Sequence, residues 1–436
     1  MSTDAAHTRT GREEAGPGGL RFCMVTTFYP PYNFGGDGIA VQRLSRALAR
    51  RGHHVTVVHD ADAYDLLSPS TPSGAPEEPP GVEVVRLRSG LGALSPLLTQ
   101  QLGRPVANGS AIRRLLEEGR FDVIWYHNVS LVGGPGILAA GEAVKIYEAH
   151  EHWLVCPTHV LWRHGREPCT GRECLRCVLR HRRPPQLWRY TGLLERRLRH
   201  VDAFIAKSEF SRRKHHEFGF ARPMEVVPYF LPDPAAEERA APAPRPHERP
   251  YFLFVGRLER IKGLDDVIPL FRDYPDADLL IIGDGDYGEA LRARAAGLAR
   301  VRFLGRLAPE ALRAYYHHAE ALIVPSVCFE TFGIILIEAF RQATPVLARH
   351  IGPFPELIRQ SGGGMLFTTP EELAAAMRRV QHEPGLRAEM AQSARAAFAQ
   401  RWSEAAVLPQ YLQVIHDAAL RSGRAQLAER LHAGAA

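Results

Sequence analysis

Residues 321–339 read ALIVPSVCFETFGIILIEA, and this stretch decides the fold. An apolar run ends at Pro325, a loop carries Glu330, and Gly333 precedes an apolar segment that predicts a helix. A buried strand followed by a loop and a helix is the unit of a parallel α/β sheet. Glu330 and Glu338, eight residues apart, could hold hydroxyl groups at the two ends of one ligand. The plain alternative is that Glu330 caps the helix and Glu338 is solvated.

The same pattern of strand and helix recurs in both halves of the chain. Apolar runs predict strands near residues 20–27, 54–59, 82–87, 121–127, 143–148 and 203–208, then near 251–256, 278–283, 301–305 and 345–348. Strands that alternate with helices favour a parallel sheet covered on both faces. The sequence therefore predicts an α/β protein with two Rossmann-like, doubly wound domains facing a central cleft. Ligands in such sheets lie at the carboxyl ends of the strands.

Composition sets the predicted boundaries and the class of protein. The chain has 436 residues, 45% of them apolar and 23% charged, which is typical of a globular protein with more than one core. The polar start predicts a disordered tail rather than a signal peptide, and no apolar run looks long enough to span a bilayer. We therefore expect a cytoplasmic protein. The predicted segments are a tail (1–19), a first domain (20–230) with a Cys-rich insertion (153–185), a Pro-rich linker (231–250), a second domain (251–405) and a C-terminal helical segment (406–436).

The net charge of +6 is concentrated in one segment. Residues 161–200 hold eleven arginines and three acidic residues. A nucleic-acid-binding protein more often spreads its charge over a long face, so no nucleic-acid partner is predicted. The segment instead predicts contact with an anionic acceptor or with the inner face of a membrane. Apolar residues at helical spacing in 186–199 fit an interfacial membrane helix or a helix that packs inward, and inward packing is favoured.

Cations and glycines follow several other predicted strands. Arg257 and Lys262 lie in a tight loop after the first strand of the second domain, where they could bind one pair of phosphates. The predicted site is completed by glycines at strand ends and by a histidine that ends a strand: Gly35, Gly36, Gly283, Gly285 and His127. Each feature alone is weak, and two solvated loop cations are a common alternative. Their shared place at carboxyl ends of strands is the stronger signal.

This ordered set resembles the family 4 retaining glycosyltransferases, which have the GT-B fold. The resemblance covers about residues 20–420 and depends on the pair Glu330 and Glu338 and on G-R-L-x3-K-G at 256–263. It implies a nucleoside diphosphate sugar as donor, a hydroxyl group as acceptor, and domains that bind acceptor (20–230) and nucleotide sugar (251–405). The implied catalytic residues are Arg257, Lys262, Glu330 and His127. The implied donor-binding residues are Gly35, Gly36, Gly283, Gly285, Phe332, Gly333, Ile334 and Glu338.

The resemblance also assigns roles within these sets. Arg257 and Lys262 would stabilise the diphosphate leaving group, Glu330 and His127 would contact the sugar, and Glu338 would bind the ribose. Three positions depart from the family pattern. Thr331 stands where Gly or Pro is frequent, Glu151 stands where Asp is more usual, and the run Gly35-Gly36-Asp37-Gly38 has a glycine where the family often has a polar or larger residue. The departure at Thr331 is the one expected to alter the sugar pocket.

No catalytic metal is expected. Fixed cations and a helix N-terminus can stabilise a departing diphosphate without a divalent ion. The Asp-x-Asp pairs that metal-dependent transferases use have candidates here, but all are explained as turn residues: Asp60/Asp62, Asp276/Asp278 and Asp284/Asp286.

Four cysteines crowd into the insertion, at Cys156, Cys169, Cys174 and Cys177. Their spacing is compatible with one tetrahedral, structural zinc ion, for which His159 and His164 are substitute ligands. Reduced, unbound cysteines or a partial disulfide are the alternative.

Other activities remain open at this point. A nucleotide-sugar epimerase would need no acceptor pocket, and a sugar phosphorylase would need a lysine for pyridoxal phosphate, for which the sequence offers no clear candidate. A non-catalytic binding protein often loses the cations or the first glutamate, and this chain keeps all of them. We therefore expect a retaining glycosyltransferase.

Overall fold

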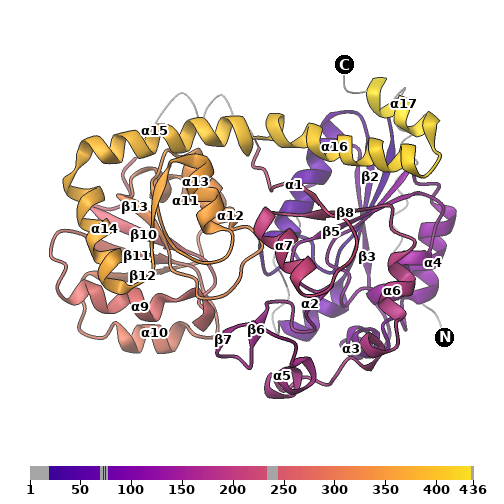
Figure 1. Cartoon of the computed structure of the whole chain (residues 1–436), viewed down its shortest axis with the longest axis horizontal. Coiled ribbons are helices and arrows are strands. Elements are labelled where there is room, and N and C mark those ends of the chain that lie inside the picture. Colours follow the sequence, from indigo (N-terminus) through magenta and orange to yellow (C-terminus); the bar gives the residue numbers. More distant parts are fainter. Residues whose placement is uncertain (1–18, 69–71, 73, 75–76, 233–243, 434–436) are drawn as a thin grey trace.

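The computed structural model describes residues 19–68, 72, 74, 77–232 and 244–433. The predicted tail up to residue 18 and residues 233–243 of the predicted linker lie outside the described residues. Two parallel sheets, each with helices on both faces, form two domains side by side (Figure 1). This arrangement confirms the predicted fold class.

The first sheet has seven strands in the order β3-β2-β1-β4-β5-β8-β9, and all neighbours are parallel. Its strands are β1 (Arg21–Val25), β2 (His54–Asp60), β3 (Val82–Leu87), β4 (Val123–Tyr126), β5 (Val144–Ala149), β8 (Ala203–Ala206) and β9 (Glu225–Val226). Its helices are α1 (Gly36–Arg50), α2 (Ala61–Leu67), α3 (Leu94–Leu102), α4 (Gly109–Glu118), α6 (Leu193–Leu198) and α7 (Glu209–Glu217), with the short helix η1 (Gly134–Ala139). The strand order reverses between β1 and β4.

The second sheet repeats this plan with the order β12-β11-β10-β13-β14-β15, again parallel. Its strands are β10 (Tyr251–Val255), β11 (Asp278–Ile282), β12 (Val301–Gly305), β13 (Ala321–Val324), β14 (Val346–Arg349) and β15 (Gly364–Phe367). Its helices are η3 (Arg260–Lys262), α9 (Leu264–Val267), η4 (Ile268–Arg272), α10 (Gly288–Arg294), α11 (Pro309–His317), α12 (Ile334–Arg341), α13 (Phe354–Ser361), α14 (Pro370–His382) and α15 (Pro384–Arg401). Here the order reverses between β10 and β13.

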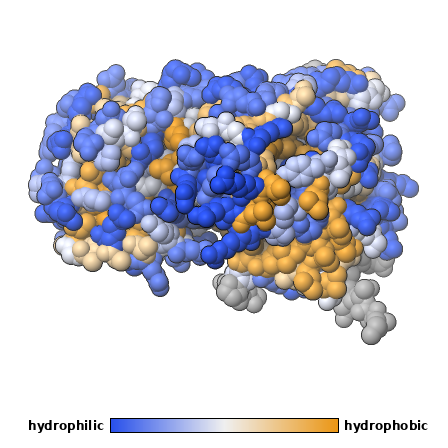
Figure 2. Space-filling view, turned by 60° about the horizontal axis from the view of Figure 1, so that its bottom comes forward, coloured by the Kyte–Doolittle hydropathy of each residue, from blue (hydrophilic) through white to orange (hydrophobic). Residues whose placement is uncertain are grey.

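The segment between β5 and β8, residues 150–202, forms an insertion that is not part of the sheet. It contains the short antiparallel pair β6 (Trp162–Arg163) and β7 (Glu167–Pro168), the helix α5 (Cys174–Arg180) and the single turn η2 (Leu187–Tyr190). The predicted helix over 186–199 is broken in two, because Gly192 adopts φ 68° between η2 and α6. A broad hydrophobic face is visible on this side of the first domain (Figure 2).

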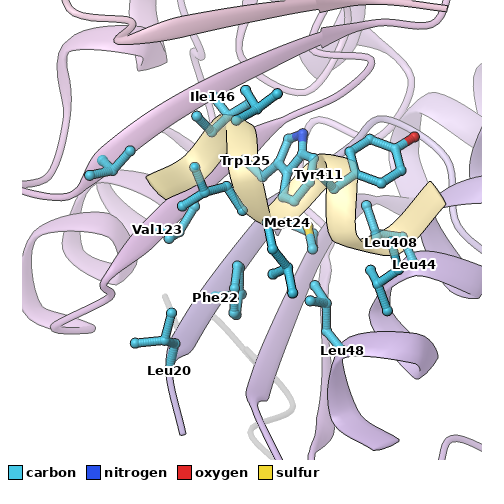
Figure 3. Packing of buried hydrophobic residues seen from close by; sticks show 14 of the residues in the cluster. Leu20, Phe22, Met24, Leu44, Leu48, Val123, Trp125, Ile146, Leu408 and Tyr411 are labelled. Atoms are coloured by element: carbon cyan, nitrogen blue, oxygen red, sulfur yellow. The ribbon is translucent and has the colours of Figure 1, made fainter. Parts of the chain in front are cut away.

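Alternation along β1 explains how the first core forms. Phe22 and Met24 point to one face of the sheet, whereas Cys23 and Val25 point to the other. On the first face, side chains of α1 pack with those of a helix from the C-terminal end, including Leu408 (Figure 3). Burying one such leucine contributes roughly 1.5–3 kcal/mol.

The C-terminal segment returns to the first domain. Phe398 of α15 packs in the core of the second domain, whereas α16 (Glu404–Arg421) and α17 (Ala425–Ala433) pack on the first. The chain therefore passes between the domains twice. The two passages touch, because the Leu231 amide donates to the Trp402 carbonyl at 3.0 Å.

Polar contacts join the two domains on the side of the predicted site. Thr331 Oγ1 donates to the His150 carbonyl at 2.8 Å, and Ser208 Oγ donates to the Thr331 carbonyl at 2.7 Å. The Glu356 carboxylate accepts the first backbone amides of α7, at 3.1 Å each. The loop between β13 and α12 thus lies directly against the first domain.

Candidate active site

The predicted site residues follow four particular strands. Gly35 and Gly36 come after β1, and His127 after β4, the two strands where the first sheet reverses. Lys262 follows β10 and Glu330 follows β13, which flank the reversal in the second sheet. Ligands of doubly wound sheets bind outside the carboxyl ends of strands at such reversals. The topology therefore gathers the motifs at the two expected positions.

Lys262 and Glu330 form the centre of the second-domain part. Lys262 Nζ contacts Glu330 Oε1 at 2.7 Å, and Ser326 Oγ donates to the same oxygen at 2.9 Å. Burial alone would raise the pKa of Glu330, but the Lys262 charge and these hydrogen bonds lower it below its usual value. Burial likewise opposes the charged form of Lys262, but Glu330 outweighs it and raises that pKa. Both groups are therefore ionised at neutral pH.

Gly263 allows this pair to form. The residue has φ 76°, and a Cβ atom there would overlap the Pro325 carbonyl oxygen. A glycine is needed for both reasons, because L side chains rarely adopt this φ and because the two loops touch here. The Val327 amide also donates to the Ile261 carbonyl at 2.9 Å. The loop after β10 is thereby fixed against the loop after β13.

Arg257 lies in the same loop but does not join that pair. Its guanidinium contacts Glu259 Oε1 at 2.7 Å, and 56% of its side chain is exposed. A long cation that is this exposed can change its rotamer at little cost. Arg257 is therefore mobile compared with Lys262, and its predicted contact with a phosphate stays a prediction.

Gly283 and Gly285 shape the neighbouring loop. They have φ values of 139° and 158°, and Cβ atoms there would collide with the backbone of Gly256 and Leu258. These glycines therefore let the loops after β10 and β11 pack closely. The predicted contact of either residue with a donor stays a prediction.

The starts of α1 and α12 face each other across the domains. A Cβ atom at Gly36 would lie 2.9 Å from Ile334 Cδ1. Gly35 and Gly333 cap the two helices, and neither helix has a side-chain cap. The first backbone amides of a helix without a side-chain cap attract anions, helped by the helix dipole. The start of α12 therefore favours a negatively charged ligand, whereas the first turn of α1 already carries the acidic Asp37.

Of the predicted donor-binding residues on and before α12, Glu338 is partly exposed and Phe332 is buried. Glu338 is partly exposed, accepts from the Tyr316 hydroxyl at 3.1 Å and lies 3.5 Å from the Arg43 guanidinium of the first domain. Phe332 is buried and packs edge-on against Tyr229, with ring centroids 5.5 Å apart. The Phe332 ring therefore serves packing between the domains, which leaves only its backbone for the predicted donor contact.

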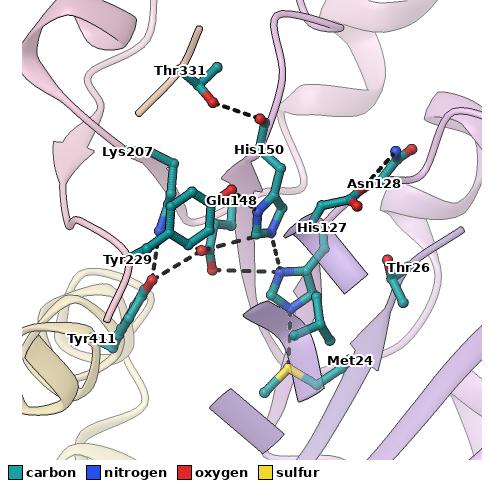
Figure 4. A network of polar contacts seen from close by, with 12 residues as sticks. Met24, Thr26, His127, Asn128, Glu148, His150, Lys207, Tyr229, Thr331 and Tyr411 are labelled. Carbon is teal, nitrogen blue, oxygen red and sulfur yellow. Dashed lines mark hydrogen bonds and ion pairs between the residues drawn. The ribbon is translucent and has the colours of Figure 1, made fainter. Parts of the chain in front are cut away.

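His127 lies in a buried polar network (Figure 4). Its Nδ1 is 2.9 Å from His150 Nε2, and its Nε2 is 3.3 Å from Met24 Sδ. Burial lowers the pKa of His127 to about 4 although Glu148 acts in the opposite direction, so the ring is neutral at pH 7. The structure does not bring this side chain to Lys262 and Glu330. His127 reaches the loop of Glu330 only through His150.

His150 is the residue at this position that sequence reasoning missed. Its carbonyl accepts from Thr331, and its Nδ1 lies 2.5 Å from the Tyr229 hydroxyl. The signal that could have identified it is the adjacent pair His150 and Glu151 at the end of β5, where only the unusual Glu151 drew notice. Thr331, noted as a departure from the family pattern, is one of the residues that join the two domains.

Lys207 completes the network and was also missed. Its Nζ is 2.5 Å from Glu148 Oε1 and 2.6 Å from the Tyr411 hydroxyl, and its side chain has no solvent exposure. His127, Glu148 and His150 form the only group of three potential metal ligands among the described residues. Lys207 already neutralises Glu148, however, and a metal ion would repel its ammonium group. This trio is therefore a structural network rather than a metal site.

The paired aspartates have structural roles. Asp60 caps α2 by accepting from the Asp62 and Ala63 amides, at 2.9 and 3.3 Å. Asp278 was expected in a turn, but it is the first residue of β11. There its side chain is buried and contacts Arg249 at 3.1 Å. This part of the sequence interpretation was wrong, because an Asp at a strand start looks like a turn residue when its cationic partner is distant in sequence.

The four cysteines of the insertion line one pocket, together with Leu161, Trp162 and Phe218. None is in a disulfide. Their sulfur atoms are not within 4.8 Å of one another as a set, since the described residues contain no cysteine group that meets this limit. The His164 amide donates to Cys177 Sγ at 3.3 Å. The fold therefore brings the four cysteines to one pocket, but their sulfur atoms are not yet close enough together to bind one metal ion.

Both domains of the chain match known protein families. A family described as "Glycosyltransferase Family 4" matches residues 34–233, and one described as "Glycosyl transferases group 1" matches residues 236–397. Glycogen synthase of Mycobacterium tuberculosis is 28% identical over 402 residues, covering 86% of this chain and 89% of that protein. A GDP-mannose-dependent phosphatidylinositol monomannoside mannosyltransferase of the same species is 26% identical, covering 79% and 84%.

Solved structures resemble the fold. Sucrose-phosphate synthase from Thermosynechococcus elongatus superimposes with a TM-score of 0.69 at 20% identity, covering 91% of this chain and 98% of that one. Anabaena HepE in complex with UDP-glucose gives a TM-score of 0.62 at 18% identity, covering 91% and 100%. At these identities the likeness concerns the arrangement of the two domains.

Proposed function

Because the chain belongs to the family 4 glycosyltransferases of GT-B fold, we propose that it moves a sugar from a nucleoside diphosphate sugar to a hydroxyl acceptor with retention of configuration. The observation that carries this proposal is the fixed pair of Lys262 and Glu330, 2.7 Å apart, beside the start of α12. The pair places a cation for the departing diphosphate next to a carboxylate for sugar hydroxyls. An anionic leaving group and a neutral sugar need these two kinds of group.

Charge development explains how the site would act. Breaking the bond between sugar and phosphate leaves negative charge on the diphosphate and positive charge on the sugar ring. Lys262, Arg257 and the uncapped amides of α12 would stabilise the first, and this needs no divalent metal. The acceptor hydroxyl would attack from the face that the leaving group vacates and pass its proton to the departing phosphate oxygen, so no enzyme nucleophile is required. Glu330 would meanwhile orient the sugar through its hydroxyl groups.

Substitutions of Glu330 and Glu338 are expected to affect different steps, sugar transfer and nucleotide binding. Glu330→Gln should lower kcat about 100-fold with little loss of free nucleotide affinity, because it alters the sugar end of the site. Glu338→Gln should weaken nucleoside diphosphate binding about tenfold, because the ribose loses a charged acceptor. Turnover assays and calorimetric titration with the nucleotide measure both effects. Equal effects of the two variants on nucleotide binding would contradict these roles.

The experiment that tests the proposed function is a donor screen followed by product analysis. Anabaena HepE was crystallised with UDP-glucose, and the mycobacterial relative is described as GDP-mannose-dependent, so UDP-, GDP- and TDP-sugars form the panel. A bound donor raises the melting temperature. NMR of the product then shows whether a sugar is transferred and whether its anomeric configuration is kept. An epimerase would return an altered donor, and a binding protein would return no product.

We also propose a structural zinc ion in the pocket of Cys156, Cys169, Cys174 and Cys177. Four sulfur ligands would fill a tetrahedral shell and leave no open position for chemistry. Burial raises the pKa of the Cys169, Cys174 and Cys177 thiols, so metal binding would have to displace protons. The ion would draw the four sulfur atoms closer together than they are now.

Metal analysis of purified protein should find about one zinc per chain. Cys174→Ser should lose the metal and lower the melting temperature, while Cys23→Ala, a buried cysteine of the β1 core, should keep it. Brief treatment with EDTA should leave sugar transfer intact, because the ion lies outside the catalytic site. Metal-free protein in which all four thiols react with a thiol reagent would refute the site.

A further inference from the structure

Exposed apolar side chains gather on one side of the first domain. Thirteen large hydrophobic side chains are exposed among the described residues, and ten of them belong to two segments. They are Leu91, Leu94, Leu97, Leu98, Leu102 and Val106 around α3, and Leu175, Leu179, Leu187 and Tyr190 in the insertion. Soluble proteins rarely expose so many together, and such a patch marks a binding surface.

The two segments form a continuous face because Trp188 joins them. Trp188 is buried, and its Nε1 donates to the Gln100 carbonyl of α3 at 2.8 Å. Its neighbours Leu187 and Tyr190 point outward and are 67% and 65% exposed. Figure 2 shows the resulting hydrophobic face, on the side where α3 and α5 lie at the margin of the molecule in Figure 1.

Arginines lie beside these apolar residues. Arg176 and Arg180 share α5 with the exposed Leu175 and Leu179, and two more arginines follow directly at 182–183. All four arginines are exposed and have no ion-pair partner among the residues that the structure describes. Unpaired cations at the rim of an aliphatic surface complement anionic lipid headgroups above an acyl layer.

We propose that this leucine–arginine face, residues 91–106 and 175–190, docks the enzyme on an anionic membrane. The leucines would enter the interface, the arginines would contact lipid phosphates, and Tyr190 would lie at headgroup level. A helix that crosses the bilayer is not needed for this mode of binding, and none of the described helices is long and apolar enough to do so. A symmetric second copy fits less well, because it would bring two sets of unpaired arginines together.

The inward packing favoured for residues 186–199 is therefore correct for only part of that segment. Leu194 and Leu198 of α6 are buried, as expected for a surface helix. Leu187 and Tyr190 belong to η2 and turn the other way. The proposed membrane-binding face consequently includes α3 and α5. Both helices lie outside residues 186–199, the segment whose apolar spacing fits an interfacial helix.

Vesicle flotation with the full-length protein tests the proposal. We expect binding to vesicles of phosphatidylcholine with phosphatidylglycerol, weaker binding to phosphatidylcholine alone, and a decrease with added salt. Leu94→Gln/Leu98→Gln should reduce vesicle affinity by about tenfold or more, because two inserted side chains become polar. Arg180→Glu/Arg183→Glu should have an effect of similar size that depends on salt.

Matched controls separate this effect from general damage. Leu420→Gln alters an exposed leucine of α16 outside the proposed face, and Arg378→Glu/Arg395→Glu makes the same charge change on the second domain. Both should float like the wild type. The proposal is overturned if no vesicle composition binds the protein, or if the face variants bind like the controls. Loss of a lipid-free dimer in the leucine variant, with vesicle binding unchanged, would instead identify a protein interface.

Discussion

Lys262→Ala is expected to lower kcat about 100- to 1000-fold, with a similar loss in kcat/KM. Under the proposed function, the Lys262 ammonium is held in place before the reaction and gains interaction energy only as charge develops on the diphosphate. Removing one such preorganised group commonly costs this much in rate. The loss of Lys262 also deprives the part-buried Glu330 carboxylate of its nearest cation, although the Ser326 hydrogen bond stays. Steady-state kinetics with a saturating donor measures the effect.

The matched control is Arg260→Ala, two residues earlier in the same short helix. Arg260 is exposed and does not contact Glu330. The Arg260→Ala variant should therefore keep a near-normal kcat. Wild-type kcat in both Lys262→Ala and Glu330→Gln would show that the chemistry takes place elsewhere in the molecule.

Lys207→Met should lower the free energy of unfolding by about 3–5 kcal/mol. Lys207 is the buried cation that balances Glu148, and removing one partner of a buried pair leaves an uncompensated charge. Lys207→Met/Glu148→Gln should recover much of the loss, because the remaining groups are neutral. Urea titrations of the two variants and the wild type make the comparison. Lys214→Met on α7 is the control and should cost less, because Lys214 keeps some exposure (18% of its side chain) and its partner Glu217 is 44% exposed.

The same pair predicts a dependence on pH. Burial opposes ionisation of Glu148, but Lys207, His150 and His127 lower its pKa from 4.5 to about 2. A carboxylate with a lowered folded-state pKa stabilises the protein above its unfolded pKa, and this contribution is lost as pH falls toward the folded value. The wild type should therefore lose more stability than the double variant between about pH 4.5 and 2. Parallel curves for the two proteins would contradict this role of Glu148.

The sequence places Lys262 and Glu330 at the same edge of the second sheet because the signals for both residues are local. Lys262 and Glu330 each follow a clear buried strand, and parallel strands bring such loops to one edge of a sheet. The buried network could not be predicted in this way. Glu148, Lys207 and Tyr411 lie far apart in the chain, and Lys207 at the end of a strand looks like a surface residue until α16 covers it.

The part of the apolar surface around α3 was not predicted for a related reason. A hydrophobic stripe in one segment predicts a covered face, but whether another element covers it depends on the whole fold. Gly192 turns the chain between η2 and α6, so that Leu187 faces outward while Leu194 faces the core. The break at a single left-handed residue decides which side each leucine takes.

The contact between Leu231 and Trp402 has a mechanical consequence. The described parts of the two passages between the domains meet here, and neither sheet extends across this point. A rotation of the domains about it would leave each sheet intact. Rotation would separate Thr331 from His150 and Glu356 from α7, and would part Gly36 from Ile334. Under the proposed function, breaking these hydroxyl and carboxylate contacts would let a donor enter and a spent nucleotide leave.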